Sequence, residues 1–343
     1  MAEDLMKKMA EKYSTRRAVD AEGEEVFLKS GSVIMDAVVS NGRGIPMNKF
    51  IQISSESGLG KTTVILHICK AALQQGKRVA YLDVEKGVNE SQMKGIGLYK
   101  YLGESFFLYP ISTFEEAEEV MDAVLQDNSL AYIVIDSITA LIPQKSLEKS
   151  VADVEPGINA RYAAQFLTKY RAKISMADNK PTVWFINQMR TKINFRGMTT
   201  YGDAGGSAQK FFADIRLNMR ESKKMTKTVA TMEGKNSVQY GSENILWADK
   251  NRFNSPFVEA VITVIFGKGV SNLLAYQRVL MSKGVCTMAG AGFWTIALPN
   301  QEPIKARGSE GLQQAIKDNI GVVKQFVDEN GGFELMEQDE SEE

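Results

Sequence analysis

The stretch Ile53–Leu66, ISSESGLGKTTVIL, begins as a short apolar strand, continues as a glycine-containing turn and ends as the start of a helix. Gly60, Lys61 and Thr62 at its centre match the end of a phosphate-binding loop. In such loops the N–H groups of the turn and of the helix start hold phosphate oxygens, the lysine reaches the terminal phosphates, and the threonine hydroxyl binds magnesium. The sequence therefore indicates a nucleotide site centred on this turn.

Ser55 stands where such a loop usually has its first glycine. If the backbone at this position needs a positive φ, serine costs about 1 kcal/mol relative to glycine. Gly58 restores local flexibility, so we expect an altered loop that still binds phosphate. The residues expected to bind the nucleotide are Ser55, Glu56, Ser57, Gly58, Leu59, Gly60, Lys61, Thr62, Thr63 and Asp136.

Apolar segments that alternate with helices predict the fold. Beyond Phe50–Ser54, strands are expected in RVAYLDVE (Arg78–Glu85), AYIVIDS (Ala131–Ser137) and TVWFINQ (Thr182–Gln188). Helices are expected at Thr62–Gln75, after the capping box of Thr113 and Glu116, and at Ile158–Ala177. This order predicts an α/β fold with a mostly parallel sheet that helices cover on both faces. Because ligands bind at the carboxyl ends of such strands, we expect one edge to gather the loop with Asp83, Glu85, Asp136, Asn187 and Gln188.

Four of these side chains have an expected role at the phosphates. Thr62 and Asp136 are expected to supply oxygen ligands for Mg²⁺. Glu85 follows a strand end, where it can orient or deprotonate a water that attacks the γ-phosphate, although a solvated loop carboxylate also fits this position. The neutral amide of Gln188 can hydrogen-bond a phosphate oxygen or a water.

Composition limits the classes of protein that fit. The chain has 343 residues, of which 44% are hydrophobic and 24% charged, with a net charge of -1. The single histidine, His67, argues against a His-rich metal site or a His-dependent triad, and we expect it to have a packing or surface role. Two cysteines cannot form a disulfide framework, and no apolar run approaches about 18 residues. We therefore expect a cytoplasmic protein that does not enter a membrane.

The two ends of the chain differ from its centre. Residues 334–343, ELMEQDESEE, carry six carboxylates and no cation. They fit either a solvated tail that aids solubility or a polyanion that competes with nucleic acid for a basic groove. The first 17 residues fit an amphipathic helix, and a less regular region is expected at 18–48. Near the C-terminus we expect a helix at 271–285, a strand at 292–298 and one last helix at about 311–328.

Eight segments between about Val26 and Gly292 carry a family likeness. They are SGSVIMDAVVSNGRGIP, SESGLGKTT, YLDVE, YIVIDSITALIP, WFINQMRTKI, AGGSAQKFFADIRLNMR, GSENILWADKNRFNSPF and FGKGVSNL. In sequence and order they resemble the bacterial-type RecA recombinase family. The resemblance implies a RecA-like P-loop NTPase core at 26–269, a short N-terminal helical segment for subunit packing at 1–25, a small C-terminal domain at 270–333 and an acidic tail at 334–343.

The resemblance also implies an activity. A family member hydrolyses ATP with Mg²⁺ between neighbouring subunits, coats single-stranded DNA as a helical filament, and pairs that strand with homologous duplex DNA. Glu85 then corresponds to the catalytic glutamate and Gln188 to the sensor of the γ-phosphate. Lys250 and Arg252, in DKNRFNSPF, correspond to cations that reach the phosphates of the adjacent subunit. Without the resemblance, this pair is typical of an exposed cationic turn.

Two segments are expected to line the DNA, at 148–161 and 189–209. The first ends in Arg161, which corresponds to a DNA-contacting arginine of the family. The second is expected to be a flexible loop with cations for phosphates, an apolar wedge and glycines for close backbone approach. Its residues expected to contact DNA are Arg190, Lys192, Ile193, Arg196, Gly205, Gly206 and Ser207.

Two departures from the family pattern affect the nucleotide site. Ser55 replaces a glycine, and Gln92 stands where the family usually has a tyrosine that stacks on adenine. We therefore expect weaker or altered base recognition, and we take a divergent, phage-encoded member as a hypothesis. Two other functions stay open: a RecA-fold ring motor or helicase, and a filament that coats single-stranded DNA with little hydrolysis.

Overall fold

A sheet of 10 strands forms the centre of the molecule. The computed structural model describes residues 25–147, 155, 157–193, 199–203, 211–231, 234–290 and 292–330. The expected N-terminal helix, most of the first DNA segment, Arg196, Gly205, Gly206, Ser207 and the acidic tail lie outside these residues. The strands lie in the order β12 (Gly269–Ser271), β11 (Glu259–Ile265), β10 (Gly234–Lys250), β9 (Ile215–Thr231), β3 (Phe50–Ser55), β7 (Thr182–Ile193), β6 (Leu130–Asp136), β4 (Arg78–Asp83) and β5 (Phe106–Tyr109), with β8 (Thr199–Asp203) beside β7.

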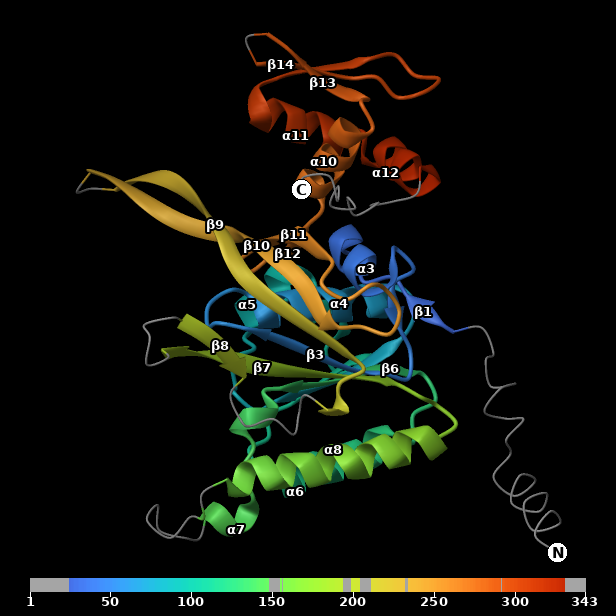
Figure 1. The fold of residues 1–343 in the computed structure, drawn as a ribbon, viewed down its shortest axis with the longest axis vertical. Coiled ribbons are helices and arrows are strands. Elements are labelled where there is room, and N and C mark those ends of the chain that lie inside the picture. The colour runs from blue at the N-terminus through green and yellow to red at the C-terminus, as the bar shows by residue number, and fades with distance from the viewer. Residues whose placement is uncertain are drawn as a thin grey trace, which may run out of the picture.

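Helices cover both faces of this sheet (Figure 1). One face packs against α3 (Val33–Ser40), α4 (Lys61–Gln74) and α5 (Glu90–Ile96). The other packs against α6 (Phe114–Val124) and α8 (Ile158–Met176). The strands from β9 to β5 are parallel, and β9 to β12 pair in antiparallel. The predicted α/β fold with a mostly parallel, doubly covered sheet is confirmed, as is the capping box at Thr113.

The apolar strands are explained by the two cores that they separate. On β6, Tyr132 and Val134 belong to one core, and Ile133 and Ile135 belong to the other. Since neither face of the sheet meets water at β6, the side chains on both faces of this strand are apolar. The sequence of the strand therefore does not alternate between apolar and polar residues.

Two expectations about irregular segments are wrong. The region 18–48 contains α3, whose first turn is capped by Ser32, since its hydroxyl accepts the N–H of Met35 at 3.2 Å. The segment 189–209 is not a single loop, because β7 continues to Ile193 and pairs with β8. Minor elements are β1 (Phe27–Leu28) paired with β2 (Ile45–Pro46), the 3₁₀ turns Tyr99–Tyr101 and Ile138–Ala140, and α7 (Gln144–Leu147).

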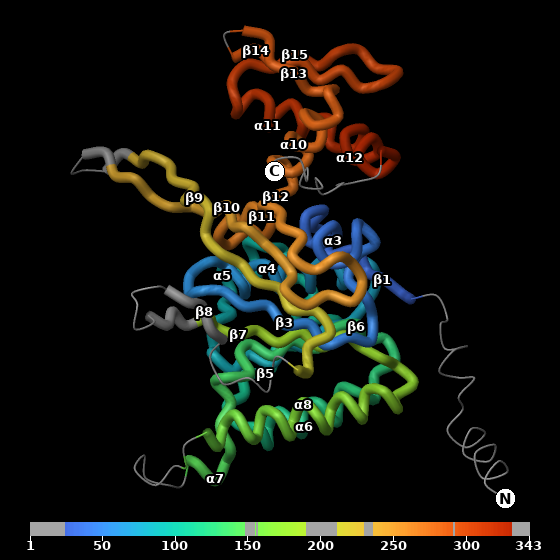
Figure 2. Tube along the Cα trace, in the orientation of Figure 1, coloured from blue at the N-terminus to red at the C-terminus, as the bar shows by residue number. Residues whose placement is uncertain are grey.

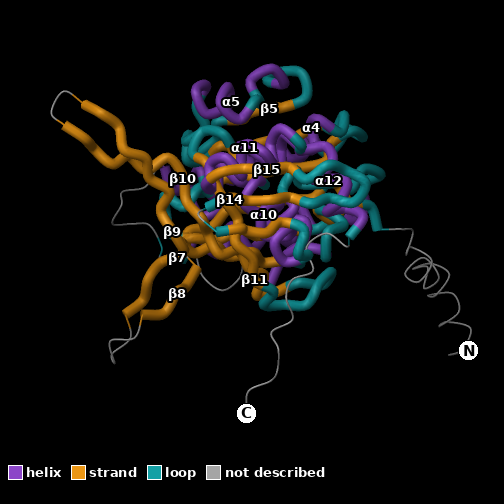
Figure 3. Tube along the Cα trace, turned by 90° about the horizontal axis from the view of Figure 1, so that it is seen from above, coloured by secondary structure: helices purple, strands orange, loops and turns teal. Residues whose placement is uncertain are grey.

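Two hairpins project from the same side of the sheet (Figure 3). One is β7–β8. The other is formed by β9 and β10, which are 17 residues each and extend well past their neighbours (Figure 1). No helix in the described part of the chain is long and apolar enough to cross a membrane.

The C-terminal part of the chain lies at one end of the molecule (Figure 2). It comprises α10 (Leu273–Ser282), β13 (Cys286–Ala289), β14 (Phe293–Ile296), β15 (Ile304–Arg307), α11 (Gly308–Asp318) and α12 (Ile320–Glu329). These elements share a third hydrophobic core. The prediction of one last helix is wrong: Asn319 separates two helices, because its side-chain amide donates to the Ala315 carbonyl at 2.9 Å and competes with the helical hydrogen bonds.

Candidate functional site

The phosphate loop joins β3 to α4. Gly58 and Gly60 have φ values of 83° and 85°, in the left-handed region that glycine adopts without strain. A Cβ on Gly60 would lie 2.8 Å from Cγ1 of Val264, so only glycine fits there. Gly60 gives α4 no side-chain cap, which leaves the first N–H groups of the helix available to an anion.

Ser55 is an ordinary strand residue. It is the last residue of β3 and does not have a positive φ, so the expected backbone cost of serine does not arise. Its hydroxyl donates to the Glu56 carbonyl at 2.8 Å. The condition for that cost, a positive φ at Ser55, is not met, because the left-handed residues of the loop are Gly58 and Gly60.

Lys61 is buried against the loop. Its ammonium donates to the Ser55 carbonyl and hydroxyl, both at 3.1 Å, and to the Glu56 carbonyl at 2.9 Å. Burial lowers the pKa of Lys61, while Asp136 and Glu85 act in the opposite direction. The ammonium thus has three oxygen acceptors, one of which is the hydroxyl that a glycine at position 55 would lack.

Asp136 ends β6 and meets the start of α4. Its Oδ2 accepts the hydroxyls of Thr62 at 2.9 Å and Tyr81 at 2.7 Å. Burial raises the pKa of Asp136, and these two hydrogen bonds partly offset the effect. No group of three or more His, Cys, Asp or Glu side chains that could hold a metal ion occurs among the residues that the structure describes. The single carboxylate and the hydroxyl fit Mg²⁺, which usually takes one or two protein oxygens and completes its shell with water and phosphate.

Glu85 contacts residues of three neighbouring strands or of the turns that follow them. It lies just past β4, and its Oε1 accepts the Ser137 hydroxyl at 2.7 Å and the Gln188 amide at 3.1 Å. Its own N–H donates to the Asp136 carbonyl at 3.1 Å. Glu85, Asp136 and Gln188 therefore gather beside the loop. The carboxylate of Asp83 instead stabilises the turn after β4, since it accepts the N–H groups of Gly87 and Val88, each at 3.1 Å.

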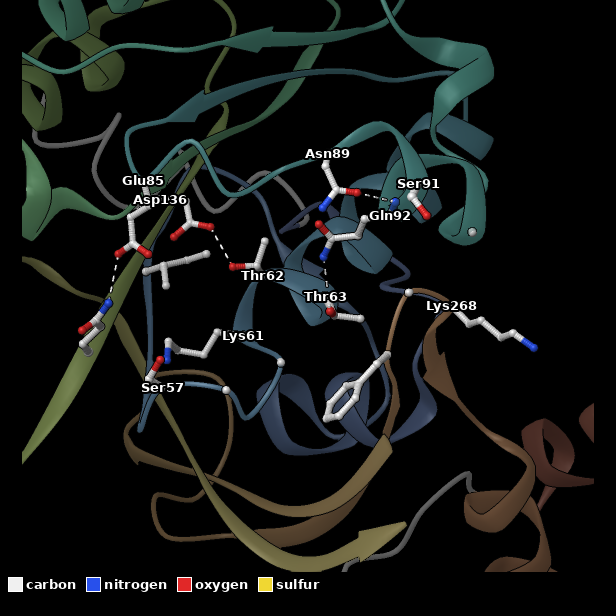
Figure 4. A pocket seen from close by; sticks show the side chains of 17 residues that line it. Ser57, Lys61, Thr62, Thr63, Glu85, Asn89, Ser91, Gln92, Asp136 and Lys268 are labelled. Carbon is white, nitrogen blue, oxygen red and sulfur yellow. Dashed lines mark hydrogen bonds between the residues drawn. The ribbon is translucent and has the colours of Figure 1, made fainter. Parts of the chain in front are cut away.

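A cavity of about 670 Å³ opens beside these groups. Figure 4 shows Lys61, Glu85 and Asp136 at one end, and Gln92 and Lys268 at the other. This volume is within the range of small-molecule sites. The sequence analysis assigned no role to several residues that line the cavity. Phe266, Gly267 and Lys268 belong to the FGKGVSNL segment that it singled out. The others are Asn89, Ser91, Gly95 and Ile186.

Lys250 and Arg252 lie near the other edge of the sheet. Lys250 ends β10 and is level with Arg216, which is in turn level with Gln52, the third residue of β3. Neither cation is among the described residues that line the cavity. The ammonium of Lys250 donates to the Phe211 carbonyl at 3.4 Å, and burial followed by the charge of Arg252 lowers the pKa of Lys250.

The expected DNA-binding residues are only partly described. Arg161 lies in the first turn of α8 and pairs with Glu155 at 3.4 Å. The backbones of Arg190, Lys192 and Ile193 belong to the β7–β8 hairpin. His67 is half-buried, and its ring nitrogens meet the Gly31 carbonyl and the N–H of Val270, each at 3.2 Å, so of the two roles expected for it the structure shows packing.

These features define the class: an α/β protein with a glycine turn of the phosphate-binding type at the carboxyl edge of its sheet. The family model of the RecA N-terminal domain matches residues 4–271. The chain is 28% identical over 319 residues to protein RecA of Lactococcus lactis subsp. cremoris (strain MG1363), covering 93% of this chain and 79% of that protein. It is 31% identical over 266 residues to protein RecA of Fusobacterium nucleatum subsp. nucleatum (78% and 67% covered), and 27% identical over 316 residues to that of Thermotoga maritima (91% and 85% covered). The chain belongs to the RecA family.

Proposed function

We propose that the protein is a DNA-dependent ATPase that forms helical filaments on single-stranded DNA and catalyses homologous pairing and strand exchange. One observation carries the proposal: the potential phosphate-binding groups are split between two edges of one sheet. Lys61, Asp136 and Glu85 adjoin the cavity, and Lys250 and Arg252 lie near the other edge. Head-to-tail stacking would unite the two sets, and an interface of this kind that does not close into a ring produces a helical filament.

The residues of the cavity suit ATP hydrolysis. The loop and the open N–H groups of α4 would hold the phosphates, and Lys61 would exchange its three carbonyl and hydroxyl acceptors for phosphate oxygens. Thr62 and Asp136 would hold Mg²⁺, which supplies positive charge to the triphosphate. Glu85 would orient the attacking water, and its hydrogen bond to Gln188 would connect it with the γ-phosphate.

The far end of the cavity would receive the base. Gln92 lies there, with its amide 3.5 Å from the Thr63 hydroxyl, and a glutamine offers no ring for stacking. Phe266 also lines the cavity and supplies an aromatic face from the turn between β11 and β12. We therefore propose that base recognition is altered rather than lost.

The DNA would be bound by the side of the molecule from which the β7–β8 hairpin projects. This hairpin carries Arg190, Lys192 and Ile193, and Arg161 lies in the first turn of α8. The proposal also includes pairing with homologous duplex DNA, assembly into a filament and a cytoplasmic location. It further includes the action of Lys250 and Arg252 in the site of the neighbouring subunit.

The proposal is tested by the rate of ATP hydrolysis with and without single-stranded DNA, over a range of protein concentrations. The rate per subunit should rise with assembly on DNA. Glu85→Gln should lower kcat by about 10²–10⁴-fold while ATP binding persists, because only the general base is removed. Glu302→Gln, at an exposed carboxylate of the C-terminal part, is the matched control.

Three results separate the alternatives. If dilute monomeric protein hydrolyses ATP as fast as assembled protein on DNA, the shared site is wrong. Binding of DNA without turnover that depends on Glu85 would support the coating filament. Closed rings in electron micrographs with ATP and DNA would support the ring motor.

A further inference from the structure

A buried carboxylate lies beside the cationic pair at the amino edge of the sheet. The side chain of Asp214 is 5% exposed. Its Oδ2 accepts the N–H of Phe50, the first residue of β3, at 2.9 Å, and the N–H of Asp214 donates to the Phe50 carbonyl at 2.7 Å. This pair of hydrogen bonds fixes Asp214 to the strand that ends at the phosphate loop.

Two guanidinium groups share this carboxylate. Arg171, on α8, donates to its two oxygens at 2.9 Å and 3.4 Å. Arg171 also donates to the Phe212 carbonyl, and its guanidinium carbon lies 4.7 Å from the ring centre of Phe50. Arg252 makes one longer contact, 3.4 Å to Oδ1, and its side chain is 65% exposed. Arg171 is therefore held on three sides, whereas Arg252 is held weakly and faces solvent.

Building on the proposed function, we propose that Asp214, with Arg171 as its fixed counter-cation, is a positioning residue that holds Arg252 toward the phosphates of the neighbouring subunit. Arg171 neutralises the buried carboxylate, since an uncompensated buried charge would destabilise the fold. Because Arg171 already occupies both oxygens, Asp214 retains only a weak attraction for Arg252.

The strength of this contact suits a residue that must change partners. A bidentate pair with Asp214 would keep the Arg252 guanidinium on its own subunit, because such pairs are strong and geometrically fixed. With no carboxylate, Arg171, Lys250 and Arg252 would repel one another. Asp214 counteracts this repulsion, and it is the carboxylate that opposes the lowering of the pKa of Lys250. The single 3.4 Å contact with Asp214 orients the Arg252 side chain and is weak enough for the guanidinium to exchange it for a phosphate.

The first test is Asp214→Asn in the full-length protein. DNA-stimulated kcat should fall about 10-fold or more, which corresponds to about 1.4 kcal/mol, with little change in the KM for ATP. The matched control is Asp249→Asn, which removes the carboxylate that pairs with Arg216 at 2.7 Å on the same side of the molecule. An equal loss in both variants would overturn the inference, because the effect would then come from general charge.

Mixing subunits separates positioning across the interface from a structural defect. Lys61→Ala should disable a subunit's own cavity and leave its cations intact, whereas Asp214→Asn should do the reverse. In an equimolar filament of the two, about a quarter of the interfaces pair an intact cavity with intact cations, so activity should return to about a quarter of the wild-type rate. If the Asp214→Asn subunit fails to recover, its defect lies in its own cavity or fold, and the inference is wrong.

A second mixture tests the proposed function itself. Lys61→Ala mixed with Arg252→Ala should recover in the same way if the site is shared between subunits. Failure of this mixture would overturn the shared site. Recovery here, together with failure of the Asp214→Asn mixture, would overturn the positioning role of Asp214 alone.

Discussion

Ser55→Gly is expected to destabilise this protein, although glycine is the residue that a phosphate loop usually has at this position. Ser55 is buried, and its hydroxyl accepts the Lys61 ammonium at 3.1 Å and donates to the Glu56 carbonyl at 2.8 Å. Loss of the hydrogen bond to the charged ammonium costs about 1.5 kcal/mol, the low end for such bonds, because Lys61 keeps two carbonyl acceptors. The extra chain entropy of a glycine inside a strand costs about 0.5–1 kcal/mol more. The free energy of unfolding should therefore fall by about 2 kcal/mol.

Thermal unfolding without nucleotide or DNA measures this difference. At about 2–4 °C per kcal/mol for a domain of 150–250 residues, the midpoint should fall by about 4–8 °C. Ser55→Ala is the matched variant, since it removes the hydroxyl and keeps a Cβ. It should show the hydrogen-bond part of the loss without most of the entropic part.

The opposite sign would refute this reasoning. A strained serine would make Ser55→Gly more stable than the wild type by about 1 kcal/mol, since glycine adopts a positive φ without cost. A Ser55→Gly variant with an unchanged or higher midpoint would therefore mean that neither the strand conformation of Ser55 nor its hydrogen bond to Lys61 determines its effect.

Two further predictions concern Mg²⁺ and the acidic tail. Burial raises the pKa of Asp136, so Mg²⁺-dependent ATP binding should strengthen as the pH rises through that raised pKa, and Asp136→Asn should remove this dependence in titrations of a fluorescent nucleotide. The same shift stabilises the nucleotide-free fold below the ordinary pKa of an aspartate, and this contribution disappears as the pH rises through the raised pKa. Deletion of residues 334–343 should strengthen DNA binding, because it removes six carboxylates that compete with the phosphates. Equal affinities and equal salt slopes for the full-length and shortened proteins would contradict that expectation.

The sequence predicts the carboxyl edge of the sheet well because the rule behind it is local. Each apolar strand ends at a polar residue, and parallel strands bring those ends together, so Glu85, Asp136 and Gln188 could be assigned to one site. The backbone of Ser55 could not be predicted in this way, since the loop pattern does not specify which residue begins the turn.

Contacts between distant parts of the chain could not be predicted from the sequence. Phe266 lines the cavity because β11 and β12 return beside α4, and strand order is not encoded in periodicity. The pairing of Arg171 with Asp214 joins residues 43 positions apart, on a helix and at a strand start. The β7–β8 hairpin was missed because its charged and polar residues have no alternating apolar pattern.

The directions of three strands agree with the proposal that the two halves of the site belong to different subunits. β3 runs toward the phosphate loop, β9 runs parallel to it, and β10 returns antiparallel. The end of β10 therefore lies level with the first half of β3: Lys250 is level with Gln52, the third residue of β3 and three residues before Ser55. At about 3.3 Å per residue and about 4.8 Å between strands, Lys250 is separated from the end of β3 by roughly 10 Å along the sheet and roughly 10 Å across it. This separation agrees with the proposal that Lys250 acts on an ATP phosphate of a second molecule stacked against this edge.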